Sequence, residues 1–404
     1  MENILIIGAF DRYNYGDLLF PLIIEKQLET LGKGYRFRFF GLVESDLSRV
    51  GGKPTEGLEA FYQACNATEE NNHVIVAGGE ALGVTWHSLF AALNPTYQKV
   101  HRYRYRLSKY IDLNAMARRF LKGKTTLPLV FTKDDFGKVS SVILNSLGGS
   151  GINKSVFGKY PFMKVKLDGV EYLAVRDRQT VENLQANQVA AQLFPDSAIL
   201  MSEFYPIVDL RDRVTPSVRE YVQANRGKYL FFQINRKNSL GEEAMIAGQL
   251  EQVYRQSATE LCLCPIGKAL DHDDHLALAE VRWQLDSPHT YFDADNIWDI
   301  MYLIANAKCY AGTSLHGAIT AMSYAVPHVG LKVEKLNAYL ATWGLPKNNF
   351  AVGFDKLFEQ FKVAVSIDQA AYTEKQQIQV GQAKKAFDVI ARVIAKGKEL
   401  HKDQ

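Results

Sequence analysis

Short apolar runs alternate with stretches that are apolar at helical spacing along most of the chain. Residues 3–9 form an apolar, β-branched run, residues 10–17 are polar, and residues 18–32 are apolar at the spacing of a helix. Residues 35–43 then alternate as a second strand would. A strand, a helix and a second strand at this spacing predict a right-handed parallel crossover.

The second half of the chain repeats this opening pattern, with a strand predicted at residues 228–235 that leads through a loop into a helix. The predicted fold class is therefore α/β, with two Rossmann-like, doubly wound domains facing a cleft. We expect an N-terminal domain over residues 1–200, a linker over 201–226 where prolines and charges break the pattern, and a C-terminal domain over 227–404. The second domain is expected to end in a long, lysine-rich helix.

Composition limits the class of protein. The 404 residues suit two or three domains, and 47% hydrophobic with 23% charged residues excludes wholesale disorder. Four cysteines make no disulfide framework, so a reducing cytoplasm is the expected compartment. No apolar run is long enough to cross a bilayer, and the N-terminus lacks the features of a cleaved signal. A net charge of +3 gives no reason to expect a nucleic-acid partner.

The loop at residues 8–17, GAFDRYNYGD, is the first candidate ligand site. It follows the first predicted strand and opens the first helix, and open α/β sheets bind ligands at the carboxyl ends of their strands. A helix N-terminus also favours an anion. The loop does not match the GxGxxG dinucleotide fingerprint. The alternative is a plain turn in which Asp17 is the N-cap and Gly16 supplies an unusual dihedral.

The segment around His316 is the most informative in the sequence. His316 follows a predicted strand that ends in Gly-Thr-Ser and stands at the start of an apolar helix. The small residues around it allow a ligand to approach the backbone closely. Histidine can exchange a proton near neutral pH, so we expect a catalytic proton donor here. A capping or core histidine is the alternative.

Arg176 also lies where a predicted strand meets a helix. Its guanidinium either clamps a carboxylate or phosphate of a ligand in a bidentate manner, or forms a local pair with Asp177 at the start of the helix. The sequence alone does not favour one of these interpretations. The cluster DHDDH at residues 271–275 could hold a metal, but an acid-rich first helical turn is the better interpretation.

A basic insertion is expected at residues 85–140 of the first domain. Residues 99–124 contain nine Lys and Arg, four Tyr and Phe, and a single acid, Asp112. A basic, aromatic segment of this kind suits peripheral contact with an anionic membrane or another polyanion. A solvated helix is the alternative.

Taken together, these stretches resemble the polysaccharide pyruvyl transferase family over roughly residues 4–335. The segments that carry the resemblance are GAFDRYNYGD, VIVAGGEALG, SLGGSG, AVRDRQTVENL, LFPDSAIL and DADNIWDIMYLIANAKCYAGTSLHGAITAMSYAVP. The resemblance implies two Rossmann-like domains arranged as in the GT-B glycosyltransferases. It also implies transfer of pyruvate from phosphoenolpyruvate to two hydroxyls of a sugar in an exopolysaccharide, cell-wall polymer or glycan, as a cyclic ketal.

The resemblance further implies roles for individual residues. Arg176 would grip the donor, His316 would be the general acid, and Lys335 would contact the donor, with Lys332 as its rival. The expected donor-side residues are Arg176, Thr313, Ser314, Leu315, His316, Gly317, Lys332, Lys335 and Arg236. The expected acceptor-side residues are Asn14, Tyr15, Gly16, Asp17, Gly78, Gly79 and Glu80.

The chain departs from the family pattern at one position. Many relatives have arginine where this chain has Ser314, so Arg236 or a lysine would have to supply the missing charge. Asp17 or Asn14 would orient or deprotonate the acceptor hydroxyl. We expect neither a cofactor nor a metal, and we expect the protein to act in the cytoplasm, at the inner face of the membrane if the acceptor is lipid-linked. Two other functions stay open: a nucleotide-sugar glycosyltransferase on the same scaffold, and a non-catalytic glycan-binding relative.

Overall fold

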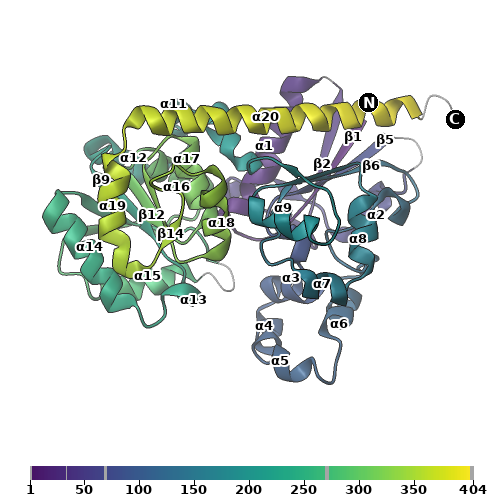
Figure 1. Cartoon of the computed structure of the whole chain (residues 1–404), viewed down its shortest axis with the longest axis horizontal. Coiled ribbons are helices and arrows are strands. Elements are labelled where there is room, and N and C mark those ends of the chain that lie inside the picture. The colour runs from purple at the N-terminus through teal and green to yellow at the C-terminus, as the bar shows by residue number, and fades with distance from the viewer. Residues whose placement is uncertain (1, 33, 68–70, 269–272, 401–404) are drawn as a thin grey trace.

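Two six-stranded parallel sheets form the framework of the computed structural model, which describes residues 2–32, 34–67, 71–268 and 273–400 (Figure 1). The strand order of the first sheet is β2-β1-β5-β6-β7-β8. Its strands are β1 (Glu2–Ile7), β2 (Tyr35–Phe40), β5 (Asn71–Ala77), β6 (Val139–Leu147), β7 (Tyr172–Val175) and β8 (Gln192–Leu193). A separate antiparallel pair is formed by β3 (Ser45–Asp46) and β4 (Pro54–Thr55).

The second sheet has the order β11-β10-β9-β12-β13-β14. Its strands are β9 (Tyr229–Gln233), β10 (Glu260–Leu263), β11 (His289–Tyr291), β12 (Cys309–Gly312), β13 (His328–Leu331) and β14 (Ala351–Val352). The central strands of both sheets are buried on both faces, which explains why their sequences are continuous apolar runs. The edge strands β8, β11 and β14 are only two or three residues long, and the hydrophobic pattern did not predict them.

Helices cover both faces of each sheet, as doubly wound domains require. Those of the first domain are α1 (Tyr15–Leu31), α2 (Leu58–Ala64), α7 (Lys154–Lys159), α8 (Phe162–Asp168) and α9 (Arg178–Gln185). Those of the second are α13 (Arg236–Ser239), α14 (Glu243–Ser257), α15 (Asp274–Arg282), α16 (Ile297–Ala305), α17 (Leu315–Ser323), α18 (Glu334–Trp343) and α19 (Leu357–Ser366). None of the helices in the described part of the chain combines the length and apolar character needed to cross a bilayer.

A helical insertion separates β5 from β6 at the position where the sequence predicts a basic one. It contains α3 (Trp86–Leu93), α4 (Pro95–Arg102), α5 (Arg104–Leu107) and α6 (Leu113–Phe120). Figure 1 shows α4, α5 and α6 projecting from the first domain, away from both sheets.

The segment expected to be a linker is helical, and the C-terminal helix crosses between the domains. The linker contains α10 (Met201–Phe204), α11 (Ile207–Leu210) and α12 (Pro216–Asn225), and the last two pack on α16. The last helix, α20 (Gln369–Leu400), contacts α17 of the second domain and then β5, β6 and β7 of the first (Figure 1). We expected this helix within the second domain. Its apolar face instead covers the first sheet, so the chain returns to the domain where it began.

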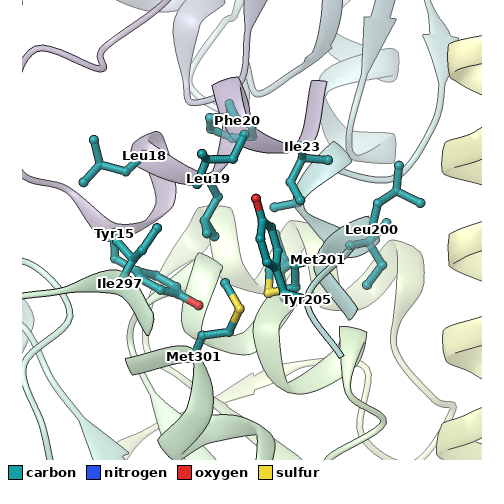
Figure 2. Close-up of a cluster of buried hydrophobic side chains, with 14 of the residues drawn as sticks. Tyr15, Leu18, Leu19, Phe20, Ile23, Leu200, Met201, Tyr205, Ile297 and Met301 are labelled. Carbon is teal, nitrogen blue, oxygen red and sulfur yellow. The ribbon is translucent and has the colours of Figure 1, made fainter. Parts of the chain in front are cut away.

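One apolar core joins the two domains. The largest cluster of buried side chains includes residues of β1, α1, α16, α17 and α20. Figure 2 shows side chains of α1, including Leu19 and Ile23, pointing toward Met301 of α16. Because apolar packing is continuous across the interface, the two sheets are held in a fixed relation near the start of α1.

Candidate active site

Helix N-termini from both domains meet where the two sheets face each other. α1 and α9 follow β1 and β7 in the first domain, and α17 and α18 follow β12 and β13 in the second. The carboxyl ends of parallel strands lie at one edge of a sheet, so these helices all start at the edge that binds ligands in such folds. α1 and α17 lie in direct contact, because a Cβ added to Gly16 would overlap Nδ1 of His316. Several partial positive charges therefore converge on one region.

The imidazole of His316 is held between the domains. Ser314 caps α17 through a hydrogen bond from the Gly317 amide (3.2 Å), which fixes the first turn that carries the histidine. The ring packs edge-on against Phe20 of α1, with ring centroids 5.3 Å apart. Its Nε2 is buried, forms no hydrogen bond with any described residue, and lies 3.6 Å from Oδ2 of Asp196. That distance is too long for a hydrogen bond but short enough for strong electrostatic coupling.

Asp196 connects this imidazole to Arg176. The aspartate follows β8, is fully buried, and accepts a hydrogen bond from Nη1 of Arg176 at 2.9 Å. Burial alone would raise the pKa of Asp196, but His316 and Arg176 more than offset it and hold the pKa below its ordinary value. The carboxylate is therefore ionised at neutral pH and faces the histidine from the first domain.

Arg176 is occupied by two carboxylates of its own domain. Besides Asp196, Nη2 of Arg176 donates to Oε1 of Glu80 at 2.7 Å. Only 2% of the Arg176 side chain is exposed, and a Cβ on Gly148 would clash with both members of the Arg176–Glu80 pair. The Trp343 indole of α18 donates to the carbonyl of Arg176 at 2.8 Å and ties this cluster to the second domain.

This environment differs from both interpretations of Arg176 that the sequence suggested. One N–H of Nη1 and one of Nη2 already bind Asp196 and Glu80, and burial of the side chain leaves little of the guanidinium open to a ligand. A local pair with Asp177 is also not what forms, because Asp177 caps α9 by accepting from the Thr180 amide. Arg176 holds two carboxylates in place.

Three partly exposed ionisable side chains line the side of this cluster that solvent reaches: Asp17, Glu80 and Lys335. Burial raises the pKa of Asp17, and nearby Arg12, His316 and Lys335 only partly oppose the shift. Burial would also raise the pKa of Glu80, but Arg176 and Lys335 bring it below its ordinary value. Burial lowers the pKa of Lys335, partly opposed by Glu80. Asp17 is thereby the carboxyl group best suited to exchange a proton.

The structure places several expected site residues in the scaffold. Tyr15 is fully buried, and its hydroxyl lies 2.7 Å from that of Thr320, so it bonds the domains together and does not face an acceptor. Leu315 is buried in the apolar core. Asn14 is the N-cap of α1, which corrects the interpretation of Asp17 as the cap. The oxygen of the buried Thr313 side chain accepts the amide hydrogen of Asn235.

Two other expected donor-side residues, Arg236 and Lys332, form ion pairs on the surface. Arg236 pairs with Glu280 at 3.0 Å, and Lys332 pairs with Glu242 at 2.8 Å, both on the surface. Lys335 is therefore the better candidate for the charge that Ser314 lacks. Gly78 and Gly79 both have positive φ, at 65° and 70°.

The two glycines shape the turn before Glu80. A Cβ on Gly78 would overlap the Phe20 ring that supports His316. Their left-handed backbone conformation favours glycine, and it aims Glu80 toward Arg176.

Sequence reasoning missed Asp196 as a site residue. It lies within the LFPDSAIL segment, but β8 is too short to show that this aspartate stands at a strand end. Of the proposed acidic cluster, residues 271 and 272 lie outside the described residues, and Asp274 is fully buried. Among the described residues no group of His, Cys, Asp and Glu is arranged to hold a metal ion.

Comparisons with known proteins agree with the sequence and the fold. The family model of polysaccharide pyruvyl transferase matches residues 14–334, which confirms the resemblance drawn from the sequence. No protein with a curated description matches the chain. Among solved structures, UDP-GlcNAc 2-epimerase from Neisseria meningitidis, bound to UDP-GlcNAc, has a TM-score of 0.57 at 12% identity, covering 98% of this chain and 100% of that chain.

Two further solved structures show the same architecture. UDP-GlcNAc 2-epimerase from Methanocaldococcus jannaschii, in complex with UDP-GlcNAc and UDP, has a TM-score of 0.53 at 11% identity, covering 91% of this chain and 94% of that chain. A variant of the wall teichoic acid polymerase TagF has a TM-score of 0.50 at 12% identity, with coverages of 99% and 90%. At these identities the likeness shows the fold alone, and it confirms the two-domain GT-B arrangement.

Proposed function

The chain belongs to the polysaccharide pyruvyl transferase family, and from this premise we propose that it transfers pyruvate from phosphoenolpyruvate to a sugar, as a ketal, with His316 as the general acid. The acceptor is a sugar of a growing glycan, presented free or on a lipid carrier in the cytoplasm. Neither a metal nor a cofactor takes part in the steps below.

One observation carries the proposal: the His316 imidazole stands between an ionised carboxylate and converging helix N-termini. Phosphoenolpyruvate brings a carboxylate and a phosphate, which need fixed positive groups and backbone N–H donors. The first turns of α1 and α17 and the ammonium of Lys335 provide such groups. Asp196 faces Nε2 of His316, which leaves Nδ1, beside Gly16, to deliver the proton.

The reaction begins with proton transfer from His316 to the methylene carbon of phosphoenolpyruvate. The adjacent carbon then acquires oxocarbenium character, and a sugar hydroxyl attacks it. The carbon–oxygen bond to phosphate breaks with its electron pair staying on phosphate, and the second hydroxyl closes the ketal. One hydroxyl proton replaces the proton that His316 gave up, and the other leaves on phosphate. General acid catalysis of this kind typically contributes about 10²–10⁴-fold in rate.

Other residues have supporting roles in this proposal. Asp17 accepts the proton of the attacking hydroxyl, since its pKa is raised and its side chain is partly exposed, and passes this proton on to restore that of His316. Asp196 stabilises the protonated imidazole, and Arg176 positions Asp196 and Glu80. Arg176 is therefore a positioning residue, and Lys335 takes over the donor contact.

A nucleotide-sugar glycosyltransferase is the second candidate. Two observations favour it: Ser314 stands where many family members have arginine, and the charge of Arg176 is already balanced by two carboxylates. Neither position therefore supplies an unpaired cation for the trianionic phosphoenolpyruvate, which pyruvyl transfer requires as donor.

Thermal-shift titration separates the two candidates. Stabilisation by phosphoenolpyruvate but not by UDP or UDP-GlcNAc supports pyruvyl transfer, and the opposite result supports the glycosyltransferase. Phosphate release from phosphoenolpyruvate, measured across a panel of sugar acceptors, then identifies the substrate. If neither donor binds while an oligosaccharide does, the protein is a non-catalytic glycan-binding relative.

A further inference from the structure

The end of the helical insertion carries a surface that the site described above does not use. This surface, the basic tip, comprises residues 99–124, from the second half of α4 to the loop after α6. It contains nine Lys and Arg against the single acid Asp112. Figure 1 shows α4, α5 and α6 at the far end of the first domain, where neither α20 nor the second domain covers them.

Aromatic side chains gather on the basic tip and point into solvent. Tyr103, Tyr105, Tyr110 and Phe120 are 60%, 75%, 87% and 68% exposed. They are four of the six large aromatic side chains with high exposure among the described residues, the others being Trp283 and Phe350 on the second domain. A solvated helix explains exposed charges, but it gives no reason for such a concentration of exposed rings.

The charges of the basic tip are mostly unopposed. Arg102, Arg106, Lys109 and Arg119 are exposed and form no ion pair within the described part of the chain. Within the described residues, Lys122 is the one member of the basic tip that pairs with an acid, Glu59, at 3.2 Å on the surface. The patch is therefore strongly cationic as well as aromatic.

We propose that the basic tip binds the surface of an anionic bilayer. Tyrosine rings settle at the level of lipid headgroups, and Lys and Arg attract anionic lipids from the same position. Single-stranded nucleic acid also uses cations and rings, but proteins hold such strands in grooves that follow the backbone. The helices of the basic tip project from the domain in Figure 1, and a flat bilayer suits such a projection better than a single strand does.

The basic tip is tied to the domain that carries the site. Nδ1 of His87, in α3, lies 2.8 Å from the Tyr97 hydroxyl of α4, and the rings of Phe90 and Phe120 stack at 5.9 Å. α3 in turn follows the turn that carries Glu80, on the expected acceptor side. Provided that the proposed function holds, membrane binding would bring that side of the site to a lipid-linked sugar, but the membrane contact itself does not depend on that function.

Co-sedimentation of the full chain with vesicles tests the proposal. The vesicles contain either phosphatidylcholine alone or phosphatidylcholine with about one third phosphatidylglycerol, each at low and high salt. We expect binding only to the anionic vesicles, reduced at least tenfold between about 50 and 500 mM NaCl, because salt screens exposed charges. No binding to anionic vesicles at low salt would overturn the proposal.

Charge-reversal variants locate the contact. The tip variant is Arg106→Glu/Lys109→Glu/Arg119→Glu. The control variant, Lys154→Glu/Lys362→Glu/Lys385→Glu, makes the same net-charge change at exposed positions elsewhere. The tip variant should lose at least tenfold in binding while the control variant keeps most of it. Equal losses in both variants, or no loss in the tip variant, would contradict a specific tip contact. Unchanged melting temperatures show that both variants remain folded.

A second variant tests whether the rings enter the bilayer interface. Tyr105→Ser/Tyr110→Ser leaves every charge in place and removes two of the most exposed rings. We expect at least a fivefold loss of vesicle binding, with binding to a single-stranded RNA oligomer weak in all variants. Unchanged vesicle binding, or tighter binding to the RNA than to the vesicles, would replace the bilayer with a general polyanion or a nucleic acid. Either result leaves the catalytic proposal untouched, since phosphate release is measured separately.

Discussion

Asp196 and Asp274 are both fully buried aspartates near the functional edge of their sheet, yet their surroundings differ. Asp196 faces the guanidinium of Arg176 and the imidazole of His316, and its pKa lies below the ordinary value. Among the residues that the structure describes, Asp274 accepts only from neutral groups, namely the Gln233 side chain at 2.7 Å and two backbone amides. Burial raises the pKa of Asp274 to about 7, despite these hydrogen bonds.

The difference indicates that the two buried aspartates have different roles, one electrostatic and one structural. Gln233 connects Asp274 to the loop before His316. Its Nε2 donates to Asp274, and its Oε1 accepts the amide hydrogen of Ser314 at 2.9 Å. Asp274 thus supports the histidine loop from within the second domain, and Asp196 supplies negative charge from the first. The cations beside Asp196 keep this carboxylate ionised when buried, whereas burial favours the protonated form of Asp274.

The largest effect is expected from Asp196→Ala. Removing this carboxylate leaves the buried Arg176 with Glu80 alone and should lower the free energy of unfolding by about 3–5 kcal/mol. Urea denaturation measures this loss. The double variant Arg176→Met/Asp196→Leu should recover part of the stability, because it removes both charges of the fully buried pair and leaves only Glu80, which is partly exposed, without its partner. A stable, fully active Asp196→Ala protein would show that the two aspartates do not differ in this way.

Gly16→Ala should mainly affect activity. The added methyl group overlaps Nδ1 of His316 and would displace the imidazole from its position between α1 and Asp196, with an expected loss of about 10²–10⁴-fold in rate. Gly248→Ala, in the middle of α14 with open space around it, is the matched control and should be neutral or slightly stabilising. Equal rates for the two variants would mean that the contact between α1 and α17 does not position the catalytic group.

In alkaline solution Asp274→Asn should raise the free energy of unfolding, whereas Asp196→Ala should lower it. The pKa of Asp274 is above its ordinary value of 3.8, so the folded protein holds a proton that the unfolded chain releases. The free energy of unfolding should therefore fall as pH rises from about 4 to about 7, and Asn removes that dependence. At pH 8 the variant should be at least as stable as the wild type. Lower stability at pH 8, measured by thermal melts, would mean that Asp274 is a stabilising anion like Asp196.

Tyr15→Phe should have the smallest effect. It deletes the hydrogen bond to Thr320 between the two domains and should lower the free energy of unfolding by about 1 kcal/mol. Tyr172→Phe is the control, because the buried Tyr172 hydroxyl forms no hydrogen bond with a described residue. Denaturation midpoints that shift equally would show that the Tyr15 contact does not hold the domains together.

Much of this arrangement could be predicted from the sequence. The buried strands are continuous apolar runs, so their order along the chain and the two-domain α/β class were predictable. The loops that carry Gly16, Glu80 and His316 were predictable as strand ends in the same way.

The contacts within the site and the position of α20 could not be predicted, because they depend on residues far apart in the sequence. Arg176 and Glu80 are 96 positions apart, and the contact between Asp196 and His316 joins different domains. The helix α20 looked like part of the second domain because its sequence follows that domain, but its apolar residues Phe387 and Ile390 lie in the core shared with the first.

The central claim is that His316 delivers a proton to phosphoenolpyruvate at the junction of the two domains. Phosphate release from phosphoenolpyruvate with a sugar acceptor, compared between the wild type and His316→Gln, tests it most directly, with Tyr172→Phe as the folded control. We expect a loss of at least about 100-fold for His316→Gln, with donor binding retained in a thermal-shift assay. Release at the wild-type rate by His316→Gln would contradict it.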